Sequence, residues 1–534
     1  MKLARLALAG LLVGALAAPA LSSPASARTA TFRWANDGDV TTMDPDMLQE
    51  TVQLSFLANV YEPLVQRDQD LKLIPGLAVK WRQVNPTTWR FHLRPGVKFQ
   101  DGTPFTSADV VFSVHRMLAK TSAMRNVMGM VKTVKAEGPL TVEFITKKPD
   151  PIFPQEQTNL LIMSKAWCEK HQATVPVVLG SGTNYAVLHA MGTGPYEVVS
   201  RQPGAKTILV ANKDWWGKLS PQAPQRVEFD VIKNDSTRVA ALLSGEEDMI
   251  YSVPPQDLGR VAHAPGVKVI EHPELRTIYL GLDVSRPQLL TSNIKGKNPL
   301  QDLRVRKAFA LAIDENLIAK RVMLGQAHPT WLMWGPGVNG YDPKLDHRPA
   351  PNLAEAKKLM AAAGYPHGFT IGMDCPDDRY VMDAQICTAV ASMLGRIGVK
   401  VNLDAQTKAK YFAKILPPKY DTDFYLLGWT PSTYDAENVL YTLLGTRNGE
   451  RGAVNVGGYS NPKLDALIAK IGSQTNEAKR DAEIDQAALI IQHDIPVIPL
   501  HQQVIVWGVR DGYHVVQPAD NSFPFRYFRM PKGK

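Results

Sequence analysis

Cysteine is scarce in this sequence: 534 residues contain three, Cys168, Cys375 and Cys387. Neither Cys-x-x-Cys nor His-Glu-x-x-His occurs, so the spacing typical of zinc ligands is missing and we expect no metal site. Three thiols cannot all pair within one chain. Cys375 and Cys387 are near each other in sequence, which predicts one local disulfide with Cys168 as a single buried thiol. Three unpaired cysteines are the alternative.

The short motifs of common enzymes are also missing. No Gly-x-x-x-x-Gly-Lys-Ser/Thr loop is present, and the glycine cluster at 192–196 has Pro195 where a phosphate loop needs a backbone donor. No Gly-x-Ser-x-Gly elbow occurs. The sequence therefore predicts neither catalysis nor a bound cofactor, and a secreted hydrolase is the alternative from a different functional class.

Basic blocks are absent although the formal net charge is +9. The 60 Lys and Arg residues are spread along the chain among 51 Asp and Glu, so the charge indicates weak surface attraction and no nucleic-acid site. With 45% apolar residues the chain can bury substantial cores, and its length allows two to four domains at about 100 to 200 residues each.

Long hydrophobic runs are confined to the first residues. Lys2 and Arg5 precede an uncharged stretch at 6–21, and small residues ending at Ala27 come before Arg28. This order is typical of a secretory signal peptide cleaved after Ala27, with an uncleaved N-terminal anchor as the alternative. Because no cysteine lies near the cleavage point, we expect an exported protein that is not a lipoprotein.

Strand and helix patterns alternate through the rest of the chain, which predicts mixed α/β layers. Residues 89–94 and 227–232 alternate apolar and polar side chains as half-buried strands do. Capping residues and apolar stripes predict helices at 461–472 and 352–364, and one helix at about 303–322. No Gly/Ser linker separates the parts, so we expect domains joined by short crossing segments, as in a hinge.

Several ordered strings make the chain recognisable. They are YEPL at 61–64, WRFHLRPGVKF at 89–99, DGTPF at 101–105, GTGPY at 192–196, RVRKAF at 304–309 and GGYSNP at 457–462. In this order, over nearly the whole chain, they resemble the extracytoplasmic solute-binding proteins of family 5, which feed dipeptide and oligopeptide ABC importers. The resemblance implies a receptor that captures a peptide or peptide-like solute by hinge closure. A non-peptide cargo such as an opine, an oligosaccharide or a metal chelate is the near alternative.

The same resemblance implies a large two-lobed periplasmic-binding-protein fold of type II, cluster C, with an extra subdomain in lobe I. Lobe I would hold 28–272 and the C-terminal return at 500–534, and lobe II 273–499, after a signal peptide at 1–27. The candidate crossings are 271–276 and 496–502. The implied partners are an ABC permease and its separate ATPase, for a protein that acts in the periplasm as a monomer.

Two ligand anchors follow from the resemblance. Peptide carriers of this family use an aspartate after Gly-Trp to hold the α-amino group, and this chain has Ser432 at that place, after Gly428-Trp429. Asp435 and Glu437 are the candidates for a substitute, which would need to lie within about 4 to 6 Å of the ammonium. Peptide specificity is therefore in question.

For the ligand carboxylate the candidate is Arg379, flanked by Asp378 and Tyr380, because the guanidinium fork matches a carboxylate with two hydrogen bonds. A structural ion pair is the alternative role for Arg379. Gly428 and Trp429 are expected to add backbone and ring contacts, although Trp429 also fits a core position. From lobe I we expect Tyr61, Glu62 and Thr41 to face them.

Overall fold

A computed structural model describes residues 31–532, so the predicted signal peptide lies outside the described residues. Its largest feature is a mixed sheet of eleven strands in the order β15-β14-β16-β12-β17-β11-β1-β10-β9-β8, with β13 paired to β17. The strands are β1 (Thr31–Asn36), β8 (Tyr196–Gln202), β9 (Lys206–Ala211), β10 (Arg226–Val231), β11 (Met249–Tyr251), β12 (Val267–Leu282), β13 (Ala327–Pro329), β14 (Thr370–Pro376), β15 (Lys400–Gln406), β16 (Phe424–Trp429) and β17 (Val497–Arg510). β10 coincides with the strand predicted at 227–232 to within one residue.

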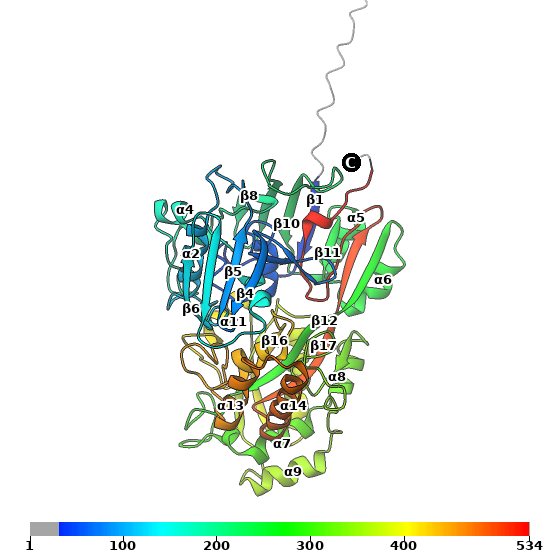
Figure 1. The fold of residues 1–534 in the computed structure, drawn as a ribbon. Helices are drawn as coiled ribbons and strands as arrows, with labels where there is room; N and C mark the ends of the chain where they lie inside the picture. The colour runs from blue at the N-terminus through cyan, green and yellow to red at the C-terminus, as the bar shows by residue number, and fades with distance from the viewer. Residues whose placement is uncertain (1–30, 533–534) are drawn as a thin grey trace, which may run out of the picture.

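Two long strands run through both parts of this sheet. β12 and β17 pair antiparallel, and their register shifts between Pro273 and Thr277. Before the shift β12 lies opposite 504–510, on the side of β11, and after it opposite 497–502, on the side of β16. We call residues 31–273 with 504–532 the upper half and residues 277–502 the lower half, as they stand in Figure 1. β12 and β17 are the strands that pass between them.

The upper half carries a second, antiparallel sheet in the order β4-β5-β7-β6. Its strands are β4 (Ala78–Asn85), β5 (Thr88–Leu93), β6 (Val131–Ala136) and β7 (Thr141–Thr146), and β5 is the strand expected at 89–94. Helix α2 (Ser107–Met117) packs beside it and begins with a capping box between Thr106 and Asp109. A two-stranded ribbon of β2 (Val65–Arg67) and β3 (Leu73–Pro75) completes the strands of this half.

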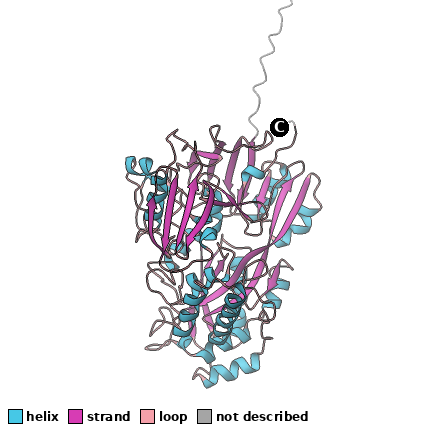
Figure 2. Cartoon of the chain, in the orientation of Figure 1, coloured by secondary structure: helices cyan, strands magenta, loops and turns pink. Residues whose placement is uncertain are grey.

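Helices surround the sheets of both halves (Figure 2). The upper helices are α1 (Thr51–Leu57), α3 (Phe153–Glu156), α4 (Lys165–Lys170), α5 (Asp235–Ser244) and α6 (Leu258–Ala262). The lower helices are α7 (Leu303–Ala312), α8 (Glu315–Arg321), α9 (Leu353–Ala362), α10 (Asp383–Gly395), α11 (Lys408–Ile415), α12 (Ala436–Val439), α13 (Pro462–Ile471) and α14 (Glu477–Asp494). The two longest of these helices, α10 and α14, belong to the lower half. α9 and α13 lie where their capping signals predicted them. Within residues 31–532, no helix is both long and apolar enough to cross a membrane.

The single helix predicted at 303–322 was wrong, because the structure has two. Ile313 leaves the helical conformation at φ −87° and ψ 113°, and Asp314 then caps α8 by accepting a hydrogen bond from the Leu317 amide at 3.0 Å. Leu317, which one continuous helix would place on the same face as Val305 and Phe309, is 41% exposed. An aspartate favours the N-cap over a helix interior, and this signal was available in the sequence.

Each half has its own buried core. In the upper half Trp34 lies between Phe229 and Phe523, with ring centroids 4.6 and 4.5 Å away, so the C-terminal segment packs back onto the first strand. In the lower half Cys375 of β14 and Cys387 of α10 form a disulfide, with Cα atoms 6.6 Å apart. Cys168 is free and buried.

Candidate ligand-binding cleft

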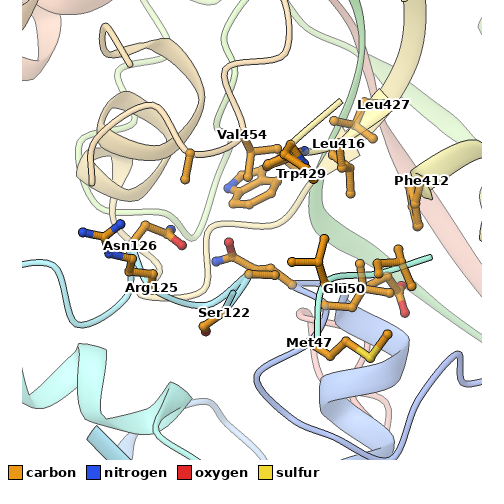
Figure 3. A pocket seen from close by; sticks show the side chains of 18 of the residues that line it. Met47, Glu50, Ser122, Arg125, Asn126, Phe412, Leu416, Leu427, Trp429 and Val454 are labelled. Atoms are coloured by element: carbon orange, nitrogen blue, oxygen red, sulfur yellow. The ribbon is translucent and has the colours of Figure 1, made fainter. Parts of the chain in front are cut away.

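A cavity of about 280 Å³ lies between the two halves. The upper half lines it with residues 47–51, Leu54, residues 120–126 (except Met124) and 178–179, and the lower half lines it mainly with Arg379, Tyr380, Phe412 and stretches of 416–432 and 447–454. Figure 3 shows Trp429, Val454, Leu416 and Leu427 on one side, with Glu50, Met47 and Ser122 opposite them. Side chains from both halves must therefore come together to form this site.

Two further cavities adjoin the first and share its lining. One of about 210 Å³ is also lined by Thr51, Leu54 and Ser432. A small one of about 20 Å³ shares Asn126 and Ser432 with the large cavity. Together they form one cleft between the halves, with Ser432 at the place where all three meet.

β16 brings Trp429 to the cleft because the strand FYLLGW ends there. The Trp429 indole N–H donates to Asn438 Oδ1 at 2.9 Å, and the Asn438 amide donates to Ser432 Oγ at 3.3 Å, which fixes the loop after the strand. Gly428 allows a close approach, since a Cβ there would lie 2.8 Å from Tyr380 Cε1 and 2.9 Å from Arg276 Cδ. Gly428, Trp429 and Ser432 all line the cleft, and their contact with a ligand stays a prediction.

Arg379 lines the same cleft and holds an ion pair with the other half. Its Nη2 lies 2.6 Å from Oε1 of Glu50, and both side chains are almost fully buried. Glu50 is the N-cap of α1 and accepts hydrogen bonds from the Val52 and Gln53 amides at 3.1 and 2.9 Å. Burial alone would raise the pKa of Glu50, but Arg379, Lys408 and the two amides lower it to about 2.

Part of the Arg379 guanidinium remains available. Nε and Nη1 are buried and have no hydrogen-bond partner among the described residues. The Arg379 and Tyr380 amides both donate to Asp383 Oδ2 at 3.0 Å, which holds the loop between β14 and α10 in place. The Tyr380 ring lies 4.7 Å from the Arg379 guanidinium and 5.6 Å from that of Arg276. Two cations therefore flank one aromatic ring, and Arg379 has free donors for an anionic group.

Three upper-half residues expected at the cleft lie elsewhere. Tyr61 is fully buried in the core of the upper half, and its hydroxyl donates to the Met43 carbonyl at 3.1 Å. Glu62 is also fully buried and accepts hydrogen bonds from Trp215, Trp216, Thr193 and Gln66. Thr41 does not line the cleft. Tyr61 joins the buried core of the large sheet in the upper half, and Leu64 joins that of the four-stranded sheet, so the recognisable string at 61–64 is structural.

Two lower-half carboxylates expected near the ligand are occupied by other groups. Asp378 accepts a hydrogen bond from the Lys408 amide at 2.5 Å, at the N-terminus of α11. Asp435 binds both Nη atoms of Arg480 at 2.6 and 2.7 Å and caps α12, and it does not line the cleft. These positions differ from the sequence expectation because each aspartate accepts a hydrogen bond from a free backbone amide at the N-terminus of a helix, a role for which aspartate is favoured.

Sequence reasoning did not identify the upper-half residues that line the cleft. Glu50 precedes the apolar helix TVQLSFL and could have been identified as its N-cap, but its pairing with Arg379 is not visible in the sequence. Asn126 lies in a loop with no motif. Within residues 31–532, no three histidine, cysteine or carboxylate side chains are grouped so that they could hold a metal ion.

Comparisons with known proteins agree with this architecture. The family model of the bacterial extracellular solute-binding proteins, family 5 (middle region), matches residues 72–451. The chain is 26% identical over 480 residues to the glutathione-binding protein GsiB of Pectobacterium atrosepticum, covering 87% of each chain. It is 23% identical over 510 residues to the periplasmic murein peptide-binding protein MppA of Escherichia coli, covering 90% of each.

Solved structures show the same fold at low identity. The A. tumefaciens R10 binding protein AgaA in complex with agropinic acid has a TM-score of 0.83 at 22% identity, over 94% of this chain and 99% of that one. The Bacillus subtilis oligopeptide-binding protein AppA in complex with a nonapeptide also has a TM-score of 0.83, at 19% identity and the same coverage. The matched residues, the mixed sheet and the cleft between its halves together place this chain in family 5 of the bacterial extracellular solute-binding proteins.

Proposed function

We propose that this protein is the periplasmic receptor of an ABC importer and that it carries a peptide or peptide-like solute with a carboxylate group. The observation that supports this most directly is Arg379, which lines the cleft with two buried nitrogens, Nε and Nη1, that have no hydrogen-bond partner among the described residues. A buried guanidinium with free donors binds a carboxylate strongly, because the hydrogen bonds are charge-assisted. Glu50 already binds Nη2, the remaining nitrogen of the guanidinium, and so fixes the orientation of the other donors.

The proposed mechanism needs no covalent chemistry. β12 and β17 connect the two halves, and the register shift between Pro273 and Thr277 is where we place the hinge. A solute that contacts both halves lowers the free energy of the closed form relative to the open form, and the permease then recognises closure. We assign lobe I to 28–272 and 500–534 and lobe II to 273–499, in a monomer released by cleavage after Ala27. The ATPase would be a separate chain.

The class of solute has a close alternative. The relatives are named for glutathione and murein peptide, and one solved neighbour holds agropinic acid. Ser432 favours the non-peptide alternative, since a serine cannot supply the negative charge that an α-ammonium requires. Arg379 is compatible with either kind of solute.

Native mass spectrometry of the protein purified from the periplasm without unfolding tests this proposal. Co-purified masses that differ by amino-acid residues would identify a peptide carrier, and one discrete small adduct would identify a dedicated non-peptide receptor. Small-angle scattering should then show compaction when the identified solute is added back. Turnover of an ester, peptide or glycoside without compaction would overturn the receptor proposal in favour of a secreted hydrolase.

A further inference from the structure

A small side cavity is lined by Ser432 and not by Arg379. Its volume is about 20 Å³, and both halves of the molecule line it. Asn126 and Glu156 come from the upper half, and Thr433 and Glu437 come from the lower half. Because it shares Asn126 and Ser432 with the main cleft, a solute in the cleft can extend a small group into it.

The polar atoms around this cavity lack partners. Asn126 and Thr433 are 7% and 6% exposed, yet Asn126 Oδ1 and Thr433 Oγ1 have no hydrogen-bond partner among the described residues. The Asn126 amide donates to Thr442 Oγ1 at 3.2 Å, so its oxygen is the atom left over. Glu156 Oε2 is also buried without a partner. Leaving such buried atoms unpaired is unfavourable. A donor group in the cavity would remove that penalty.

Acidic side chains gather around the cavity. Glu437 and Glu156 line it, and Asp150 interacts electrostatically with both. Burial raises the pKa of Glu437 to about 8 and that of Asp150 to about 7. Arg480 is the nearby cation, and its guanidinium already binds Asp435 through two hydrogen bonds. The carboxyl groups therefore outnumber the cations, and an entering positive charge would stabilise their ionised forms.

The size of the cavity restricts what can enter. A space of about 20 Å³ holds a group of the size of one water molecule. A primary ammonium is that small, carries a full positive charge and offers three donors. A guanidinium or an aromatic ring is too large.

We propose that this cavity, formed by Asn126, Glu156, Thr433 and Glu437, binds the primary ammonium of the transported solute. It would replace the amine anchor that Ser432 cannot provide. The inference rests on the proposed receptor function and makes it more specific: the solute carries an ammonium for this cavity and a carboxylate for Arg379, so it is zwitterionic.

A matched pair of ligand pools tests the subsite. The probe is a pool of di- to pentapeptides from an exhaustive casein digest, offered once with free amines and once after acetylation of all amines. Peptides retained by the ligand-free protein after desalting are identified and quantified by mass spectrometry. We expect the wild type to retain about ten times as much peptide, or more, from the free-amine pool as from the acetylated pool. Acetylation removes a charged hydrogen bond, and such a loss has an effect of this size.

The variants locate the effect. E156Q with E437Q keeps the shape of the cavity and replaces its two ionisable carboxyl groups with amides that cannot become negative, and we expect retention of the free-amine pool to fall about tenfold or more. E137Q with E246Q, at two exposed positions of the upper half, is the control with the same number of Glu→Gln changes, and we expect it to retain the pool as the wild type does. If the double variant does not fold, the proposal is tested with E156Q and E437Q separately and with the comparison of free-amine and acetylated pools on the wild type.

The possible failures are distinguishable. Equal retention of both pools by the wild type, or a double variant that binds as the wild type does, overturns the ammonium subsite and leaves the peptide receptor intact. If the wild type retains neither pool, the peptide-receptor proposal fails and the subsite proposal fails with it.

Discussion

Glu50 and Arg379 meet across the cleft, with Oε1 of the carboxylate 2.6 Å from Nη2 of the guanidinium. Glu50 belongs to the upper half, where it caps α1, and Arg379 belongs to the lower half, after β14. The pair can form only when the halves are close together. The same guanidinium lines the cavity. Under the proposed function, Glu50 and a ligand carboxylate would share this one cation, and the pair would couple closure of the protein to occupancy of the site.

Neutralising Glu50 is expected to favour the open form of the ligand-free protein. In E50Q the one remaining side-chain oxygen can still accept a hydrogen bond from one of the two helix amides, so α1 keeps part of its cap, while the charge attraction to Arg379 is lost. Small-angle scattering should therefore give a larger radius of gyration for E50Q than for the wild type. K147Q is the control, because Lys147 and Glu450 form an exposed pair between the halves and exposed pairs contribute about 0 to 1 kcal/mol. Identical scattering from E50Q and wild type would contradict this role for the pair.

Arg379→Gln is expected to weaken binding of a carboxylate-bearing solute by about 100-fold, since truncating one member of a buried charged pair costs about 2 to 5 kcal/mol. The affinity is measured by calorimetry with the solute identified from the native protein. A solute whose carboxylate is converted to an amide should lose much less affinity between wild type and variant. R304Q, which changes a half-exposed arginine on α7, should bind as the wild type does. Equal losses for the acid and the amide would assign Arg379 a structural role only.

The scaffold was largely predictable from the sequence, because local chemistry determines it. Asn461 followed by Pro462 marks the start of α13, and the alternating residues of β5 mark a half-buried strand. The break between α7 and α8 was missed because the apolar stripe continues through Ile313 and the capping tendency of Asp314 was not weighed against it.

The cleft was only half predictable. Arg379 and Trp429 were found through resemblance, and both line the cavity. The sequence analysis placed Glu62 at the cleft, whereas it is buried and accepts hydrogen bonds from four side chains. A buried structural glutamate and an exposed ligand-binding glutamate look the same in a sequence. Glu50 and Arg379 are more than 300 residues apart in the chain, and they pair only because the two halves close on each other. One sequence carries no signal of that closure.

Removing the disulfide is expected to destabilise the lower half. Cys375 and Cys387 are 12 residues apart, and a bridge that closes a loop of this length contributes about 3 kcal/mol by restricting the unfolded chain. C375S with C387S should unfold at a lower denaturant concentration. Thiol counting on the unfolded, unreduced protein should find one free thiol, and three after reduction. Finding three before reduction would contradict the bridge.

Cys168 provides an internal control for that count. Burial raises the pKa of its thiol to about 12, so little thiolate is present at neutral pH and the side chain is inaccessible. A thiol reagent should label the native protein slowly and the unfolded protein at once. Fast labelling of the native protein would mean that α4 opens readily.

The buried acids beside the cleft are expected to make the ligand-free protein less stable as pH rises. Burial raises the pKa of Glu437 to about 8, from an ordinary value of 4.5. Below pH 4.5 the group is protonated in both states and has no effect. Between pH 4.5 and 8 the unfolded chain has lost this proton and the folded chain retains it, so unfolding releases a proton and rising pH favours unfolding. Asp150, with its pKa raised to about 7, acts in the same direction.

Urea unfolding at pH 5, 6, 7 and 8 measures this effect, and E437Q isolates the part due to one residue. The glutamine cannot ionise, so the stability of E437Q should fall less between pH 5 and 8 than that of the wild type, with the two proteins most similar at pH 5. E137Q, an exposed glutamate removed elsewhere, should keep the wild-type slope. The neighbours Glu156, Asp435 and Arg480 remain in every variant, so a difference in how the free energy of unfolding changes with pH is due to Glu437. Parallel curves for wild type and E437Q would mean that Glu437 is ionised in the folded protein throughout this range, held by a cation that binds in the cavity.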